Sequence, residues 1–459
     1  MKHEHPVKIL RYCALNLWLL LFPLLRSITL IPFSPDAIGN WLRGAWMDII
    51  VMLFIFGLAL LRWLMCRFYL NKECFMLVHG IIMQKHIVIP FDKITAVSES
   101  DIRLPFILKL SFFKIDTAAG KASGSTVLWL RAKDCSEFSE LIPICKKDRP
   151  YLFSYSINPW TVLLYSFLFS SSISGTLYIA AFFIEAGNAA GEILTELHIA
   201  KALSEMSNAA ASVFRAVPEI IILILIILLF CRILSFIVNL LSCSGFHTRV
   251  NKKHIMISSG FFPKKKVHIY LPSIECVILK QRLLSRLSQK ASLFITYPSC
   301  SKDRQTLLVP IVSERQMHSS VLFKGHKSKS FSSQKALWCF LWQPFTIISI
   351  ILGLLLIISY TKPYACEILF PLSGIALVPA AALLLVRLIS FRIQFASQDD
   401  KSITLCYSKG LSFFTLNADK ENIAVIKITR TPAAIKHHYF NAIVHLKGGQ
   451  TAVLRGISK

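Results

Sequence analysis

The densest group of chemically active side chains in this 459-residue sequence is basic. Lys264, Lys265 and Lys266 follow closely after Gly260, in a segment that predicts a hairpin between two strands. Further cations precede them in the sequence at Arg249, Lys252 and Lys253. Each lysine that reaches an anionic bilayer surface contributes about 1 kcal/mol of attraction. The segment is therefore either a patch that binds anionic headgroups or a partner, or a solvated basic loop that only helps to orient the protein.

No catalytic constellation accompanies these cations. The sequence lacks the motifs GxxxxGK[ST], GxSxG and HExxH and any DFG-like set. His437 and His438 are adjacent, so their side chains diverge and do not form a metal-binding pair. The 12 cysteines include no CxxC pair and are interpreted as scattered free thiols. The sequence therefore predicts a protein that is not an enzyme and carries no cofactor or metal.

The composition indicates a membrane protein. Hydrophobic residues make up 54% of the chain and the mean hydropathy is +0.57, yet the net charge is +26. The apolar residues must then be segregated into blocks that alternate with basic blocks. A basic chain can also bind nucleic acid, but basic flanks beside apolar segments orient membrane helices. We expect anionic lipid headgroups as partners and no nucleic acid.

Six apolar segments have close to the 20 residues that a helix needs to cross a bilayer. They are Cys13–Ile31, Trp46–Met65, Trp160–Ile184, Pro218–Leu241, Leu337–Ser359 and Ile368–Ile389. Taken in pairs, they predict transmembrane hairpins at 1–66, 159–241 and 336–390. Lys and Arg are dense outside the pairs, which predicts a multi-pass membrane protein whose N-terminus and polar blocks are cytoplasmic. The connection between the two segments of the second pair should lie outside the membrane. It has helical periodicity over 190–214, which fits a spacer or a partner-binding amphipathic helix.

The three polar blocks, 67–150, 242–325 and 391–459, repeat one pattern. Each has a strand-like run, a glycine, a second run and then an isoleucine that begins a third run. The glycines are Gly80, Gly260 and Gly410, and the isoleucines are Ile94, Ile274 and Ile423. The first and second copies keep the same spacing throughout, and the first also has Pro90 at the end of its second run. Short strands joined by turns and closed by a helix predict a small barrel or sandwich.

This pattern resembles the bacterial pleckstrin-homology-like domain of YdbS/YdbT-type membrane proteins. The second copy carries the motif best, in Gln281, Leu283, Leu284, Arg286 and Leu287. The resemblance implies an α+β protein of the bacterial plasma membrane, with six transmembrane helices in three hairpins. Each hairpin is then followed by a cytoplasmic PH-like barrel or sandwich that ends in a helix. It also implies a second membrane protein of the same family, or another copy of this chain, as a partner.

The third copy departs from the pattern. It has Thr429–Ile435 where the second copy has its motif, and its last strand-like run ends at the point where the closing helix begins in the other copies. Such a domain needs a helix over one open end of its core. We expect the third domain to be incomplete, or capped by a neighbouring domain or a partner.

Two functions fit these features. The first is a non-enzymatic membrane scaffold whose PH-like modules bind proteins or anionic lipid in envelope homeostasis or stress defence. The second is a lipid-handling protein or small-solute transporter that uses a six-helix bundle. The apolar segments carry no acidic partner at mid-depth for an ion-coupled path, which favours the scaffold.

Overall fold

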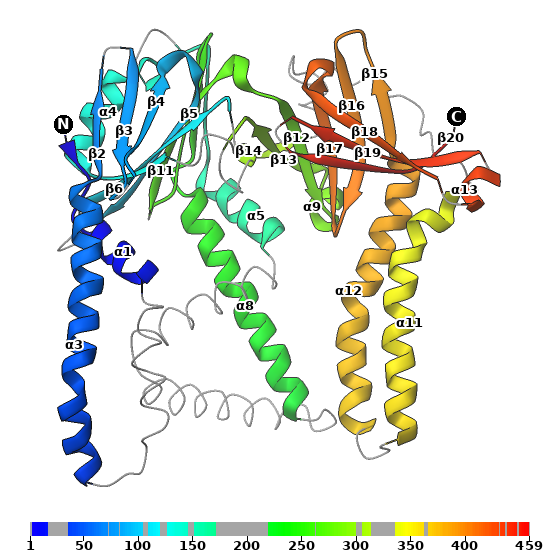
Figure 1. The fold of residues 1–459 in the computed structure, drawn as a ribbon. Coiled ribbons are helices and arrows are strands. Elements are labelled where there is room, and N and C mark those ends of the chain that lie inside the picture. Colours follow the sequence, from blue (N-terminus) through cyan, green and yellow to red (C-terminus); the bar gives the residue numbers. More distant parts are fainter. Residues whose placement is uncertain are drawn as a thin grey trace.

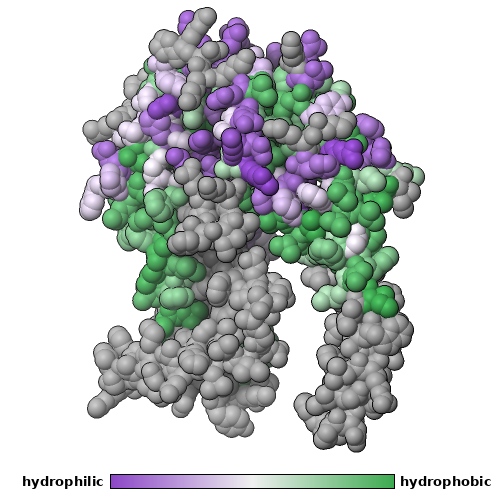
Figure 2. All heavy atoms as spheres, turned by 90° about the vertical axis from the view of Figure 1, so that its left-hand side faces the viewer, coloured by the Kyte–Doolittle hydropathy of each residue, from purple (hydrophilic) through white to green (hydrophobic). Residues whose placement is uncertain are grey.

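The computed structural model describes residues 2–16, 35–71, 73–81, 83–103, 109–119, 126–145, 151–170, 219–261, 263–299, 305–313, 336–361, 366–430, 432–436, 438–447 and 449–458. The strands lie together on one side of the molecule, and the long helices extend from them in a common direction (Figure 1). Figure 2 shows hydrophilic residues over the strands and hydrophobic residues where the helices leave them. The polar and apolar blocks of the sequence are therefore separated in space.

The first repeat is a domain of strands closed by one helix. Its strands are β2 (Arg67–Leu70), β3 (Cys74–His79), β4 (Lys85–Pro90), β5 (Ile94–Arg103), β6 (Lys109–Thr117) and β7 (Thr126–Arg131), followed by α4 (Ala132–Leu141) and the 3-10 turn η4 (Pro143–Cys145). Phe138 of α4 packs edge-on against Phe68 of β2, with ring centroids 5.2 Å apart. Both rings are buried, so the helix closes the core of the domain.

The N-terminal residues add to this domain. Strand β1 (Lys2–His3) pairs antiparallel with Phe68 and Arg67 of β2. The next residue, Glu4, is buried; its carboxylate binds Lys8, and its carbonyl accepts a hydrogen bond of 2.9 Å from the Trp63 indole. The chain before the first apolar segment is thus part of the first domain, which the sequence did not reveal.

The second and third repeats follow the same plan. The second contains β8 (Phe153–Ser156), β9 (His247–Val250), β10 (His254–Ser259), β11 (Lys264–Tyr270), β12 (Cys276–Arg282), α9 (Leu283–Leu287), β13 (Lys290–Thr296) and β14 (Gln305–Ser313). The third contains β15 (Phe395–Gln398), β16 (Ser402–Lys409), β17 (Ser412–Asp419), β18 (Ile423–Thr429), α13 (Pro432–Lys436), β19 (Tyr439–Leu446) and β20 (Thr451–Ser458). These domains agree with the expected PH-like sandwiches.

One turn recurs in all three domains. A single turn of 3-10 helix precedes each shared isoleucine, at Phe91–Lys93, Leu271–Ser273 and Lys420–Asn422. The backbone of Ile94, Ile274 and Ile423 has φ of −78°, −72° and −80°, with ψ of 120°, 121° and 120°. Each isoleucine N–H donates to the carbonyl of the first residue of that turn. The aligned isoleucines therefore occupy equivalent positions.

The domains share their sheets. β5 of the first domain pairs antiparallel with β11 of the second, within a seven-stranded sheet of order β7-β6-β5-β11-β10-β9-β8. β12 of the second domain pairs with β17 of the third, within a six-stranded sheet of order β14-β13-β12-β17-β16-β15. Smaller sheets, β1-β2-β3-β4 and β18-β19-β20, stand at the two ends. We call this array of four sheets the belt. Main-chain hydrogen bonds between strands cross both of its domain boundaries.

The helices that leave the belt differ in length. They are α1 (Lys8–Asn16), α3 (Pro35–Leu64), α5 (Pro159–Phe169), α8 (Glu219–Cys243), α11 (Leu337–Thr361) and α12 (Cys366–Ile393). The last two run side by side from the third domain (Figure 1).

The prediction of six transmembrane helices is wrong. In the part of the chain that the structure describes, two helices are long and apolar enough to cross a membrane, at Ile226–Cys243 of α8 and Leu337–Tyr360 of α11. The apolar parts of α3 and α5 are Ile50–Leu64 and Pro159–Phe169. At 1.5 Å per residue, an 11-residue helix such as α5 spans about 17 Å, which is short of the roughly 30 Å of a hydrocarbon core.

A contact with a distant residue lies at the end of α5. Within the predicted span Trp160–Ile184, α5 ends at Phe169, and Ser170 has an extended backbone with φ of −67° and ψ of 146°. The guanidinium of Arg282, at the end of β12, donates a hydrogen bond of 2.7 Å to the Ser170 carbonyl. An apolar run in a sequence does not reveal this contact, which joins residues 112 positions apart.

Other expectations concern residues outside the described ranges. The amphipathic helix expected at 190–214 and most of the expected span Cys13–Ile31 are among them. The expectation of an incomplete third domain stays a prediction. The structure does place the start of α11 against this domain, because buried Ala336 packs with Ala434 and Tyr439.

The glycine at the second hairpin provides a test of the turn geometry. Gly260 has φ of +90°, and a Cβ atom there would collide with the carbonyl oxygen of Pro263. We predict that Gly260→Ala lowers the free energy of unfolding by about 1–3 kcal/mol, because both backbone strain and a clash are introduced. The thermal unfolding midpoint of the full chain in mild detergent measures the effect.

Gly57→Ala in α3 is the matched control. A Cβ at Gly57 meets nothing within 4 Å, so the midpoint should stay the same or rise slightly because alanine favours helix. Equal midpoints for the two variants would contradict the strained turn.

Candidate functional site

The hairpins β3–β4, β10–β11 and β16–β17 each have an exposed apolar side chain at the turn, which we call the tip. Gly80, Gly260 and Gly410 have φ of +124°, +90° and +59°, in the region that glycine tolerates best. The side chains that follow them, Ile81, Phe261 and Leu411, are 41%, 77% and 39% exposed. Each hairpin therefore presents an apolar side chain at its tip.

The second tip is fixed to the end of α8. The Gly260 N–H donates to the Ser244 carbonyl at 2.9 Å, and the Phe261 N–H donates to the Leu241 carbonyl at 3.0 Å. The last carbonyls of a helix have no partner within the helix, so the hairpin satisfies them. Phe261 is thereby held level with the C-terminal end of a helix that is apolar enough to cross a bilayer.

The third tip is tied to its helices by one arginine. Arg387 of α12 donates hydrogen bonds to the Ser408 carbonyl and hydroxyl, at 3.2 and 2.9 Å, near the end of β16. Its second terminal nitrogen donates to Gln343 of α11 at 2.9 Å. The arginine therefore links both helices to the strand that leads into the hairpin.

Three of the predicted site residues follow the second tip directly. Lys264, Lys265 and Lys266 begin β11, where they pair with Asp101, Ser100 and Glu99 of β5. The first two are exposed, whereas the Lys266 ammonium lies 3.9 Å from the carboxylate of buried Glu99. Lys264 and Lys265 are thus the cations of this group that face solvent beside the tip.

The other predicted cations lie elsewhere in the domain. Lys252 and Lys253 occupy the turn between β9 and β10, at the opposite end of β10 from Gly260. Arg249 lies on β9, and its guanidinium is 4.9 Å from the centre of the Tyr151 ring. The structure therefore divides the six-residue patch into two groups.

The family-like signature of the second repeat holds a domain boundary together. Arg286 of α9 donates to the Gln281 side-chain oxygen at 3.2 Å, and its guanidinium lies 4.9 Å from the Phe413 ring of β17. Gln281 is buried and donates to the Lys290 carbonyl at 3.4 Å. These residues contact the third domain and do not form a surface site.

Sequence reasoning missed a buried polar cluster at the first boundary. Glu99 of β5, Cys145 of η4 and His268 of β11 place their ligand atoms within 4.8 Å of one another. Carboxylate, thiolate and imidazole are zinc ligands, but Lys266 also contacts the carboxylate and opposes a cation there. The three residues come from separate elements of two domains, so no spacing in the sequence could have identified them.

Burial controls protonation in this cluster. Desolvation, with help from Lys266 and His254, lowers the pKa of His268 to about 4. Desolvation raises the pKa of Glu99, although Lys266 opposes the shift. His268 is therefore neutral at pH 7, as burial beside a lysine requires.

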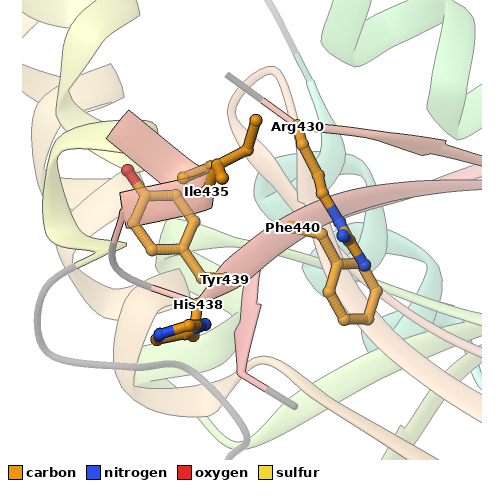
Figure 3. Close-up of a pocket in the computed structure, with 6 residues that line it drawn as sticks. Arg430, Ile435, His438, Tyr439 and Phe440 are labelled. Carbon is orange, nitrogen blue, oxygen red and sulfur yellow. The ribbon is translucent and has the colours of Figure 1, made fainter. Parts of the chain in front are cut away.

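A small pocket lies in the third domain. It is a cavity of about 170 Å³ lined by Arg430, Ala434, Ile435, His438, Tyr439 and Phe440. Figure 3 shows the Arg430 side chain beside the Phe440 ring, and His438 near Tyr439 on another side of the pocket. His437 is outside the described residues. The pocket has one cation and no carboxylate, which suits an apolar or anionic group.

A family comparison agrees with these domains. The family model of the bacterial PH domain matches residues 20–148 and 200–320, more than half of the chain. The chain belongs to the bacterial PH domain family. A bacterial PH domain suggests a module for binding lipids or proteins. No match was found among the curated proteins.

The partly buried His268 predicts a pH dependence of stability. The pKa of His268 is about 4 in the folded protein, against 6.5 for an ordinary histidine, so the unfolded chain binds the proton more readily. Its contribution is complete above pH 6.5 and is lost as the pH falls towards 4, by up to about 3 kcal/mol. We predict that His268→Gln removes this part of the acid destabilisation, measured as unfolding midpoints from pH 7 to 4.

Glu99 acts with the opposite sign. Its raised pKa stabilises the fold below the ordinary value of 4.5, and that contribution is lost as the pH rises through the folded value. His3→Gln, at an exposed histidine of β1, is the control and should leave the wild-type profile unchanged. If His268→Gln and wild type have parallel profiles, the neutral buried histidine is ruled out.

Proposed function

We propose that this protein is a non-enzymatic, membrane-associated scaffold that presents a belt of bacterial PH domains at a bilayer surface. In this proposal α8 and α11 anchor the belt, and the second hairpin tip contacts anionic headgroups. Phe261 inserts between the acyl chains, while Lys264 and Lys265 pair with phosphates. The rest of the belt remains available to bind proteins.

One observation carries this proposal: the contact between the second tip and the end of α8. It combines an aromatic side chain that is 77% exposed, two solvent-facing lysines and a helix that is apolar enough to enter a membrane. Aromatic and basic side chains are both favoured at the level of the headgroups. The alternative of a transporter required a six-helix bundle and loses its premise with that bundle.

The lysines provide the test. The full chain is reconstituted into nanodiscs of phosphatidylcholine, with or without 30% phosphatidylglycerol, and its unfolding midpoint is measured at low and high salt. We predict that anionic lipid raises the midpoint in a salt-sensitive way. Lys264→Glu with Lys265→Glu should abolish this gain, which corresponds to about 1 kcal/mol for each lysine.

The chain offers a matched control in the same domain. Lys252→Glu with Lys253→Glu makes the same charge change at the opposite end of β10, and it should leave the gain intact. If both double variants lose the gain equally, general charge is responsible and the tip is not the contact. If neither loses it, headgroup binding by Lys264 and Lys265 is excluded.

A further inference from the structure

The strand pairs β5–β11 and β12–β17, which we call the joints, connect neighbouring domains with the same register. At the first joint Ala96 of β5 lies opposite Ile269 of β11, and at the second Cys276 of β12 lies opposite Ala418 of β17. In both cases a residue two positions after one shared isoleucine faces a residue five positions before the shared isoleucine of the next domain. The joint is therefore a repeated interaction, like the domains it connects.

The third domain has the same strand without the same neighbour. β18 begins at its shared isoleucine, as β5 does, and in the described residues it pairs with β19 alone. Val425 and Ile426 are 49% and 51% exposed, whereas the equivalent residues of the first joint, Ala96 and Val97, are fully buried. Ile428 is also 56% exposed. An apolar edge strand of this kind is a template for a further strand.

The other end of the belt has the complementary edge. β4 is the first-domain equivalent of β11 and β17, the strands that complete the two joints. Within the described ranges it pairs only with β3, and Val88 on it is 49% exposed. One chain therefore has both strands of a further joint, β18 and β4, at opposite ends of the belt (Figure 1).

The pocket in the third domain belongs to the same open joint. It lies beside α13, which follows β18 as α9 follows β12. At the second joint, Arg286 of α9 packs against Phe413 of the following domain. In α13, by contrast, Ile435 is 61% exposed and lines the pocket. The pocket thus occupies the place where a following domain would make contact.

We propose that β18 of one chain pairs antiparallel with β4 of a second copy of this chain, so that the belt continues from copy to copy. The register of the two internal joints places Val425 opposite Ile89, Ile426 opposite Val88 and Lys427 opposite Ile87. Main-chain hydrogen bonds supply the affinity, as in other cases of strand addition. The contact is head-to-tail, so the copies form a ring where the rotation closes and a filament where it does not.

Two observations favour a second copy over an unrelated partner. The pairing continues an interface that the chain already makes twice, with apolar residues facing apolar residues at the first two positions. The long helices leave the belt in one direction, so a neighbour added in the same way keeps its helices on the same side (Figure 1). The proposed register also places no two cations directly opposite each other, because Lys85 faces Thr429.

Engineered disulfides test this register. Chains with Ile426→Cys and chains with Val88→Cys carry different tags, are co-expressed and are oxidised in membranes. Directly opposed Cβ atoms lie about 4.5–5.5 Å apart, so a disulfide-linked pair bearing both tags is expected. Ile426→Cys with Ile87→Cys is the control, shifted by one residue and therefore facing the other side of the sheet. Yields no higher than this control would overturn the proposal.

A second measurement uses no cysteines. Ile428→Lys places a charge on the edge and should convert the detergent-solubilised oligomer to monomer, as determined by light scattering. Leu152→Lys, at a leucine that is 66% exposed and lies outside the joint, should leave the oligomer intact. A monomeric wild-type chain would overturn the proposal; slow amide exchange of 423–429 in that monomer would identify a segment of the same chain as the occupant. Exclusive cross-linking of Ile426→Cys to a different protein would likewise overturn it.

Discussion

Main-chain hydrogen bonds between β5 and β11, and between β12 and β17, hold the three domains in one continuous structure. A domain boundary usually falls in a linker that few contacts cross. Here the boundary is a strand pair, and the buried side chains around it depend on that pair. Glu99 is held by Lys266 from the second domain, and Arg286 rests on Phe413 from the third. Side chains at both boundaries therefore have partners from the neighbouring domain.

Local patterns of the sequence predicted much of each domain. The glycines at Gly80, Gly260 and Gly410 identified the hairpins because their backbones need positive φ. The spacing from these glycines to the shared isoleucines identified the repeat, and the turn before each isoleucine has nearly the same geometry in all three copies. These features depend on residues close together in the chain, which is why one sequence was enough to find them.

Features that depend on distant residues were not predicted. β1 pairs with a strand more than 60 residues away, and α5 ends where Arg282 binds Ser170. The six-helix prediction was wrong because hydropathy measures composition along a segment and does not show where each helix begins and ends. The basic patch was separated for a related reason. Lys252 and Lys264 are near in sequence, but a strand between them sends the two groups to opposite ends.

The shared sheets also impose an order on synthesis. The edge of β5 is free when the first domain leaves the ribosome, and it stays free until β11 has been made. The same delay separates β12 from β17. Exposed strand edges in partly made chains are sites of misassembly. Each open edge therefore lasts while the segment between its two paired strands is made, and the joint between β5 and β11 is completed before the joint between β12 and β17.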